Sequence, residues 1–476
     1  MPGAPSARFP LGYLLFLCAV ATLAGFLFGF DSAVINGTVT ALSAAFGTSA
    51  AGTGLAVSSV LFGSVAGSLL AGQHADRFGR KPVMLATAVL FAVSAWGSGA
   101  AHSAGAFILY RLVGGLGVGA ACVVAPAYIA EISPAALRGR LTTIQQLAIV
   151  SGLQCAFLSN FCIARAAGSA GQGWLLGVPA WRWMFWVQLV PSAGYLLASL
   201  FLPESPRYLV ARGREDEARG VMRRLWGDSV DPAATLAEIR ATVDQQARPH
   251  FRDVFVPGTR RLLPIVWVAV ALGFFQQASG INAVVYFGEY LWRAAGFTES
   301  HALLINVTLG AVLIMATLVS MTLVDRVGRR PLLLAGGGVM TAMLGVLAAV
   351  FLLSARGADG ALAMTSAQAT ATLVAEHAYI FCFGASWGPV IWVLFGEMFP
   401  NRIRGSAIAV AAGTLWVTNC AVTTTFPILL KLIGLGGVFC LYAAAALASL
   451  WTVQRFVKET KGRALEEMVA HSFPGQ

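Results

Sequence analysis

Charged residues are scarce in this sequence, since only 11% of its 476 residues are Asp, Glu, Lys or Arg. A soluble domain usually carries about 25%, because its surface must face water. Hydrophobic residues make up 57% of the chain, and the mean hydropathy is +0.74. A chain of this length and composition must keep most of its surface away from water, which excludes an ordinary soluble domain and favours a lipid bilayer as its surroundings.

Several catalytic and metal-binding patterns are also missing. The seven cysteines form no CxxC pair and no Cys/His cluster, so the sequence predicts neither a zinc site nor a disulfide framework. No nucleophile–base pair, phosphate-binding loop or metal cluster is present, so we expect no enzyme and no cofactor. The first apolar run, residues 11–29, lacks a cleavable boundary and continues into further apolar sequence, which predicts a retained span and not a signal peptide.

Long apolar runs fill most of the chain. A helix needs about 20 apolar residues to cross the hydrocarbon core of a bilayer. Runs of that length lie at about 12–34, 51–73, 82–101, 106–130, 141–164, 182–202, 262–293, 302–324, 331–354, 368–397, 405–431 and 434–457. Many of the 52 glycines lie inside these runs, where small residues let helices pack closely in lipid. The sequence therefore predicts an all-α membrane protein with twelve transmembrane helices.

A charged segment at 203–261 interrupts the apolar runs and divides them into two sets of six. We expect an N-terminal six-helix bundle at 1–202, a linker with short amphipathic helices at 203–261, a C-terminal six-helix bundle at 262–457 and a tail at 458–476. Of the 32 basic residues, 26 lie on one side of the predicted spans. The positive-inside rule places that side, with the linker and both termini, in the cytoplasm, as expected for a multi-pass protein of the cell membrane. Basic residues spread over separate loops also exclude a nucleic-acid surface.

Two motifs occur twice, six spans apart. DRFGRKP at 76–82 follows the second span and DRVGRRP at 325–331 follows the eighth. Likewise Glu131 precedes Arg138 after the fourth span, and Glu397 precedes Arg404 after the tenth. Such a repeat indicates two halves related by an axis along the membrane normal. A single copy is readily explained as ordinary loop charge, but two copies in register favour a shared structural role.

Further motifs complete the pattern of a known family. They are PESPR at 203–207, ETKG at 459–462, QQ at 276–277 with GIN at 280–282, and GP at 388–389 followed by Trp392. With the paired motifs, they make the chain similar to the sugar porter family of the major facilitator superfamily over residues 20–465. The resemblance implies two pseudo-symmetric six-helix bundles around a central cavity, monosaccharides as substrates, and function as a monomer.

The acids and bases of the paired motifs are predicted to form a cytoplasmic gate. We expect an interdomain charge network that stabilises the outward-open state weakly enough to break in each cycle. Its expected members are Asp76, Arg80, Glu131, Arg138, Glu204, Arg207, Asp325, Arg329, Glu397 and Arg404.

A sugar needs amide or hydroxyl partners for its OH groups and an aromatic surface for its apolar faces. Gln276, Gln277 and Asn282 lie in the middle of the seventh span, where lipid would leave them unsatisfied. The alternative is that they hold helices together, the usual role of amides in a membrane bundle, and their clustering favours ligands. The resemblance implies that these three bind sugar hydroxyls with Gln146 and Trp392, and that Trp416 adds a further wall. Two positions that are polar in many family members are Leu313 and Leu415 in this chain, so we expect the affinity or the preferred sugar to differ from theirs.

Asp31 lies inside the first span, where an ionised carboxylate costs about 3 kcal/mol, so a functional role is expected. Its natural partner is Arg111, otherwise alone in the fourth span, because Arg cannot shed its proton. We expect protonation of Asp31 to release Arg111 and favour the other conformation. The resemblance implies the same, since Asp at this position is typical of proton symporters. A static buried ion pair is the alternative.

Three other ionisable residues, Glu289, Glu376 and His377, are expected near the outer ends of spans where water reaches them. Two competing functions remain open. A facilitator would use Asp31 only structurally, and sugar-induced alkalinisation of the medium separates it from a proton symporter. A transporter-like sugar sensor is the other alternative, but such sensors typically carry long cytoplasmic extensions, and only about ten residues precede the first span and about twenty follow the last.

Overall fold

The computed structural model describes residues 11–227, 232–244, 251–256, 259, 261–356, 362–400 and 403–461. Helices dominate the described chain. The first half holds α1 (Leu11–Val34), η1 (Ile35–Gly37), α2 (Val39–Phe46), α3 (Ala50–Phe78), α4 (Arg80–Ala100), α5 (Ala104–Ile132), α6 (Ala135–Ala167), η2 (Leu175–Gly177), α7 (Ala180–Trp186) and α8 (Leu189–Leu200).

The second half repeats this arrangement with more interruptions. It holds α12 (Pro264–Ala278), α13 (Ile281–Ala294), α14 (Glu299–Val327), α15 (Arg329–Leu353), the two-residue strands β1 (Ala355–Arg356) and β2 (Leu362–Ala363), α16 (Ser366–Cys382), the π-helical turn η5 (Phe383–Trp387), α17 (Gly388–Met398) and α18 (Arg404–Phe456). β1 and β2 pair as an antiparallel hairpin.

The number of membrane crossings agrees with the sequence prediction. Eleven helical stretches are long and apolar enough to cross a membrane within the described chain, and the last, α18, has 53 residues. That length is far more than one crossing needs. α18 breaks at Gly434, whose φ of 69° is in the region that favours glycine. The two parts of α18 therefore supply spans eleven and twelve, which confirms the predicted all-α, twelve-helix fold.

The described part of the linker between the halves contains four short helices. They are α9 (Pro206–Ala211), α10 (Glu215–Trp226), α11 (Pro232–Asp244) and η4 (Phe251–Val254). α10 is amphipathic, with a charged first turn and a buried face that ends at Trp226. The indole nitrogen of Trp226 donates to the backbone oxygen of Ile132 at 3.0 Å, which fastens α10 to the end of α5.

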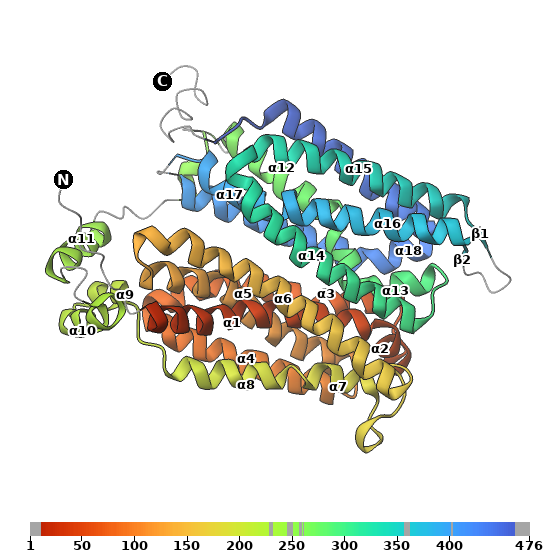
Figure 1. Ribbon diagram of the computed structural model, residues 1–476, viewed down its shortest axis with the longest axis horizontal. Helices are drawn as coiled ribbons and strands as arrows, with labels where there is room; N and C mark the ends of the chain where they lie inside the picture. Colours follow the sequence, from red (N-terminus) through yellow and green to blue (C-terminus); the bar gives the residue numbers. More distant parts are fainter. Residues whose placement is uncertain are drawn as a thin grey trace.

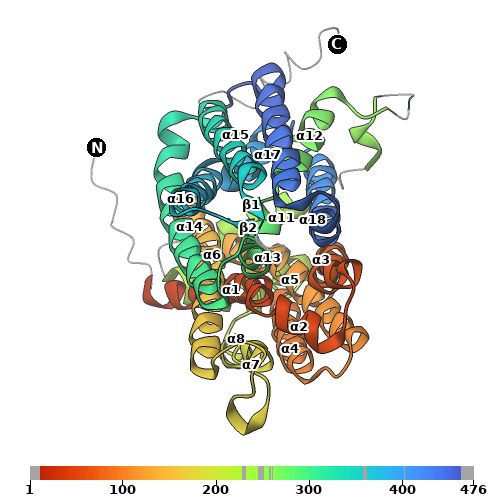
Figure 2. The same ribbon diagram turned by 90° about the vertical axis from the view of Figure 1, so that its right-hand side faces the viewer.

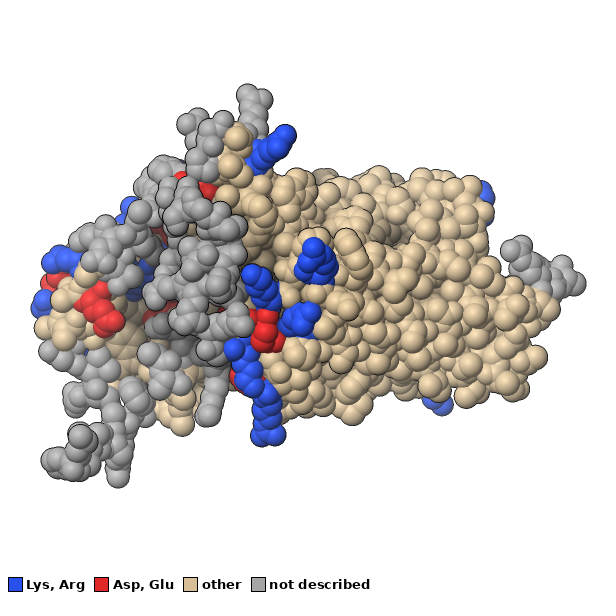
Figure 3. Space-filling view, turned by 90° about the horizontal axis from the view of Figure 1, so that it is seen from above, with Lys and Arg blue, Asp and Glu red and all other residues tan. Residues whose placement is uncertain are grey.

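The two halves lie against each other with their long helices along one direction (Figure 1). The linker helices α9–α11 lie at one end of the molecule and the β1–β2 hairpin at the opposite end. We call these the linker end and the hairpin end. On the face shown in Figure 3, charged side chains gather towards the linker end, and the surface beyond them carries few charges. An uncharged band next to a charged end is the pattern expected of a protein seated in a bilayer.

Close helix contacts explain the glycines inside the spans. A Cβ added at Gly115 on α5 would lie 2.1 Å from the backbone oxygen of Val60 on α3. One added at Gly29 on α1 would lie 1.8 Å from the backbone oxygen of Ile149 on α6. Real side chains do not approach backbone this closely, so glycine is required where these helices cross.

Candidate functional site

The seventh span is broken in its middle, and the predicted amides lie around the break. α12 ends at Ala278 and α13 begins at Ile281, with Gly280 between them at a φ of 84°. Glycine tolerates this left-handed angle, so the helix can be interrupted here within one span. A broken helix of this kind exposes polar groups at mid-membrane, where a substrate is bound in many transporters.

The three amides form a chain of hydrogen bonds. Asn282 donates from Nδ2 to Oε1 of Gln277 at 2.6 Å, and Gln277 donates from Nε2 to Oε1 of Gln276 at 3.3 Å. Gln276 donates in turn to the backbone oxygens of Trp387 at 3.0 Å and Gly388 at 3.3 Å, where η5 meets α17. The structure thus brings together the three residues that the sequence predicted as a group, and ties them to the tenth span.

The other predicted sugar contacts are more dispersed. Gln146 on α6 and Trp416 on α18 are half-buried, one in each half of the molecule. Trp392 on α17 is 45% exposed, and its ring stands edge-on to Phe395 at a centroid distance of 6.0 Å. Leu415 is buried beside Trp416.

Asn419 was not singled out from the sequence. It is buried on α18 and accepts a hydrogen bond from Thr423 at 3.1 Å. Tyr286 on α13 also contacts it. The available signal was an asparagine inside an apolar span, one turn beyond Trp416.

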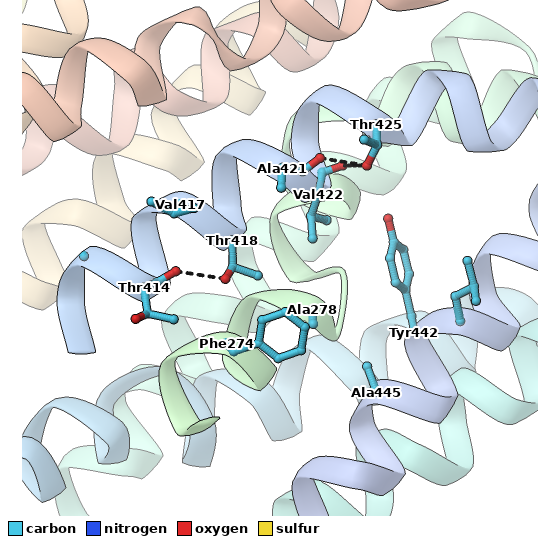
Figure 4. Close-up of a pocket in the computed structure, with 12 residues that line it drawn as sticks. Phe274, Ala278, Thr414, Val417, Thr418, Ala421, Val422, Thr425, Tyr442 and Ala445 are labelled. Atoms are coloured by element: carbon cyan, nitrogen blue, oxygen red, sulfur yellow. Dashed lines mark hydrogen bonds between the residues drawn. The ribbon is translucent and has the colours of Figure 1, made fainter. Parts of the chain in front are cut away.

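An apolar pocket lies elsewhere in the second half, between α12 and the two parts of α18 (Figure 4). Phe274, Ala278, Val417 and Leu441 are among its walls, and Tyr442 points its hydroxyl into it. Gln276 is two positions from both Phe274 and Ala278, so by the helical period it lies on the opposite face of α12. None of the three amides is among the pocket's lining residues, and its largely apolar walls are poorly suited to a molecule covered with hydroxyls.

Asp31 and Arg111 form a fully buried ion pair. Arg111 donates from Nη1 to Oδ2 of Asp31 at 2.8 Å and from Nη2 to its backbone oxygen at 3.0 Å. Both residues are 0% exposed. The ring of Phe185 lies against the guanidinium at 5.8 Å, while Nε of Arg111 has no hydrogen-bond partner in the described chain. The pairing predicted from two isolated charges in apolar spans is thus present in the structure.

A third residue completes this site. Gln188, in the short gap between α7 and α8, donates from Nε2 to Oδ1 of Asp31 at 3.0 Å and is 0% exposed. Both carboxylate oxygens of Asp31 therefore have a hydrogen-bond donor. The sequence contained a signal for Gln188, because it is a single amide inside an otherwise apolar run of the sixth span.

The repeated motifs build one charge cluster in each half. In the first half, Arg80 pairs with Asp76 at 3.3 Å and with Glu131 at 3.0 Å. Glu204 accepts hydrogen bonds from the backbone N–H groups of Arg80 at 2.9 Å and Lys81 at 3.3 Å. Gly79 makes the preceding turn with a φ of 102°, which is why the motif contains glycine.

The second half repeats the cluster. Arg329 pairs with Asp325 at 3.2 Å and with Glu397 at 2.7 Å, following Gly328, whose φ is also 102°. Glu397 accepts a further bond from the hydroxyl of Thr460 at 2.6 Å. Glu459 accepts from the backbone N–H groups of Arg329 at 3.0 Å and Arg330 at 2.9 Å.

In this conformation, these ion pairs do not form the expected network across the two halves. The pairs of Arg80 stay within the first half, and those of Arg329 stay within the second. Arg404 donates to the backbone oxygen of Phe399 at 3.4 Å, and Arg207 is half-buried at the first turn of α9. The side chain of Arg138 lies outside the described residues. The motif charges are available to exchange partners only if the halves move.

At the hairpin end, side-chain hydrogen bonds do join the two halves. Asn36 donates to the backbone oxygen of Val285 at 2.6 Å and accepts from the Asn306 amide at 2.7 Å. Thr40 donates to Oε2 of Glu289 at 2.7 Å. In the view from this end, α13 lies at the centre, where the two halves meet (Figure 2). The structure is therefore closed at the hairpin end, with α13 as part of the closure.

The expectation of water-exposed carboxyls near the outer ends was wrong for two residues. Glu289 on α13 and Glu376 on α16 are each only 2% exposed. His377 is half-buried, with Nδ1 3.6 Å from Oε2 of Glu376. Glu289 faces the first half, where Thr40 and Asn36 bond to it, and Glu376 lies among the helices of the second half with Trp292 of α13 beside it. The distance of a residue from the end of its span does not reveal such contacts.

Two six-helix halves, a broken helix with clustered amides and a buried acid–base pair define a multi-pass membrane transporter. Residues 17–471 match the family model described as sugar (and other) transporter. The chain is 49% identical over 459 residues to the glucose transport protein of Synechocystis sp., covering 96% of this chain and 97% of that protein. It is 34% identical over 500 residues to the D-xylose-proton symporter of Escherichia coli K12, with 98% and 97% of the two chains covered.

Solved structures of sugar transporters also match this chain. The inward open conformation of the xylose transporter XylE from E. coli matches with a TM-score of 0.82 at 32% identity, over 96% of this chain and 100% of that one. XylE bound to 6-bromo-6-deoxy-D-glucose matches with a TM-score of 0.76 at 32% identity, over 98% and 100% of the chains. The chain belongs to the sugar porter family of the major facilitator superfamily, and it is a sugar transporter and not an enzyme.

Proposed function

We propose that this protein imports a monosaccharide, a hexose or a pentose, together with a proton by alternating access. The observation that carries the proposal is the buried Asp31, held by Arg111 and Gln188 within a membrane span. The names of two relatives, a glucose transport protein and a D-xylose-proton symporter, support the substrate class and the coupling ion.

The ion pair explains how a proton can change the conformation. Breaking a buried pair by neutralising one partner leaves the other charge unpaired, at a cost of about 3–5 kcal/mol. Protonation of Asp31 would leave Arg111 in that position. The guanidinium cannot neutralise itself, so the protein favours a conformation in which Arg111 has another partner. A ligand shifts a conformational equilibrium only by such a difference between states.

The sugar would bind at the amides around the α12–α13 break. Gln276, Gln277 and Asn282 provide donors and acceptors without a formal charge, which allows binding and release. Gln146, Trp392 and Trp416 would complete the site from α6, α17 and α18. Because Gln276 is bonded to the backbone at Trp387, sugar binding on α12 is mechanically linked to the tenth span.

The orientation and the gate belong to the same proposal. The linker end carries the basic clusters and would face the cytoplasm, with both termini there and the protein in the cell membrane. In the outward-open state, the charges of the two clusters would exchange partners across the halves and close the linker end. The described ion pairs, each within one half, suit the opposite state, in which the hairpin end is closed. The protein would function as a monomer.

The test is transport by purified protein in proteoliposomes with Asp31→Asn. We expect sugar counterflow to persist and proton-driven accumulation to disappear, because Asn cannot bind and release the proton. Asp216→Asn, an exposed aspartate on α10, is the matched control and should accumulate sugar as the parent does. Accumulation by Asp31→Asn equal to that of the parent would show that the carboxyl is structural. Coupling would then pass through another group. A parent protein that itself shows no proton-driven accumulation would be a facilitator, in which Asp31 holds the first half together.

A further inference from the structure

Glu376 is a buried carboxyl that the proposed transport mechanism does not use. It lies on α16, three turns from the hairpin-end start of that helix, and is 2% exposed. Neither of its carboxylate oxygens has a hydrogen-bond partner of ordinary length among the described residues, although the indole of Trp292 lies close enough to interact with the carboxyl. An ionised carboxylate removed from water without donors or a close cation is very costly, and such groups take up a proton instead.

The groups around Glu376 supply little to hold a negative charge. On α16 itself, His377 is 3.6 Å away, but its Nδ1 is bonded to the Leu373 backbone oxygen at 2.8 Å. Its Nε2 is bonded to the Thr308 hydroxyl on α14 at 2.9 Å. Tyr379, one turn on, donates its hydroxyl to the backbone oxygen of Ser279 at 3.0 Å. From α13, the indole N–H of Trp292 interacts with the carboxyl.

Trp292 depends on the position of α13. This helix starts at the Gly280 break, and its hydrogen bonds with Asn36 and Thr40 close the hairpin end. Trp292 follows Glu289 by three residues and is itself buried. Any opening of the hairpin end must move α13 away from the first half, and Trp292 moves with it.

We propose that Glu376 is a proton-binding site of the hairpin-end gate. It holds a proton while α13 covers it, and it releases that proton to water at the hairpin end when α13 moves away. Closing the gate therefore takes up one proton from the same side. This site differs from Asp31, because its proton returns to the side it came from and is not carried across. The inference rests on alternating access, and it stands whether or not Asp31 couples transport to protons.

The consequence is a gate that responds to pH at the hairpin end. When one conformation binds a proton that the other does not, the equilibrium between them changes by up to about tenfold per pH unit. Acid at the hairpin end favours the closed gate, and alkali favours the open gate. Glu376→Gln imitates the protonated acid in size and shape, so we expect a folded protein whose gate no longer responds to pH.

Gate opening can be measured by thiol labelling of Val39→Cys, which lies at the start of α2 and is 0% exposed in the closed state. Labelling is counted as the increase over the parent with its own cysteines. The thiolate is the reactive form, so labelling itself speeds up with pH and is compared between variants at the same pH. We expect the ratio of labelling in the otherwise wild-type protein to labelling in Glu376→Gln to rise several-fold per unit of external pH. Labelling in Asp31→Asn should keep the pH response, which separates this proposal from the coupling role of Asp31.

Infrared spectroscopy gives an independent test that does not rely on transport. The gate-closed protein at neutral pH should show the carbonyl stretch of a protonated carboxylic acid, and Glu376→Gln should lose this band. A matched variant, His377→Gln, should retain it. The proposal is wrong if Glu376→Gln keeps the wild-type pH response of labelling. It is also wrong if the acid band is absent from the wild type and arises only in His377→Gln, because His377 would then be the counter-ion of an ionised Glu376.

Discussion

Glu204 and Glu459 hold equivalent places in the two halves of the molecule. Glu204 accepts hydrogen bonds from the backbone N–H groups of Arg80 and Lys81 at the start of α4. Glu459 accepts the corresponding bonds from Arg329 and Arg330 at the start of α15. The first N–H groups of a helix lack partners within it and favour a negative charge, so each carboxylate caps the helix that follows the repeated glycine turn.

The cap in the second half makes stability depend on pH. Burial opposes ionisation of Glu459, yet four backbone N–H groups donate to it, and their bonds hold the pKa of this carboxyl below its ordinary value of 4.5. A lowered pKa means that the stabilisation is complete above the ordinary value and is lost as the pH falls through the lowered one. We expect Glu459→Gln to unfold at a lower temperature than the parent at neutral pH, with the gap narrowing in acid.

Thermal unfolding of the detergent-solubilised protein over a range of pH measures this. Lys458→Gln, which changes the exposed neighbouring residue, is the control and should leave the profile unchanged. A gap between parent and Glu459→Gln that is the same at every pH would contradict the capping role of the ionised carboxylate.

The contact between Gln188 and Asp31 predicts a coupled loss of stability. Gln188→Leu leaves one oxygen of a buried carboxylate without its donor, which costs about 1–3 kcal/mol of unfolding free energy. In an Asp31→Asn background the same change should cost less, since the charge is gone. A double-mutant cycle on unfolding measures the difference. Strictly additive losses would mean that the amide and the carboxylate do not interact.

The bonds of Asn36 predict which changes open the hairpin end. Asn36→Ala removes its contacts with Val285 and Asn306, each worth about 1 kcal/mol. We expect a several-fold rise in the labelling of Val39→Cys. Asn160→Ala removes a bond to the backbone of Val34 within one half and should not raise labelling. Equal effects of the two changes would show general loosening and not a gate.

Substitutions in the amide cluster and in the apolar pocket should affect sugar affinity differently. Gln277→Ala removes both a donor and an acceptor beside the helix break, and we expect sugar affinity to fall about tenfold or more in counterflow. Thr418→Ala alters the wall of the pocket in Figure 4 and should leave affinity unchanged. The reverse outcome would move the sugar site to the pocket.

Much of this architecture could be predicted without coordinates. Apolar runs long enough to span a bilayer identify the helices, because lipid permits few other backbone arrangements. The pairing of Asp31 with Arg111 was predictable for a related reason. Two isolated charges of opposite sign in apolar spans cost too much to remain apart. The break at Gly280 and the turns at Gly79 and Gly328 occur at glycines in recognisable motifs.

Other features depended on packing across the chain. Gln188 donates a hydrogen bond to Asp31 only because the gap between α7 and α8 lies against α1. The motif charges could be assigned to a gate from their spacing, but not to separate clusters, since partner choice depends on which state the halves adopt. The positions of Glu289 and Glu376 in their spans suggested contact with water, whereas packing between helices buries both.

By itself, the sequence determined the number of spans, the two related halves, the charged linker and the acid–base pair, because hydrophobic length and the cost of lone charges act locally along each helix. The tertiary structure alone decided which end is closed and which carboxyls lose water. Those properties depend on how one half rests against the other, and the same sequence supports both arrangements during transport.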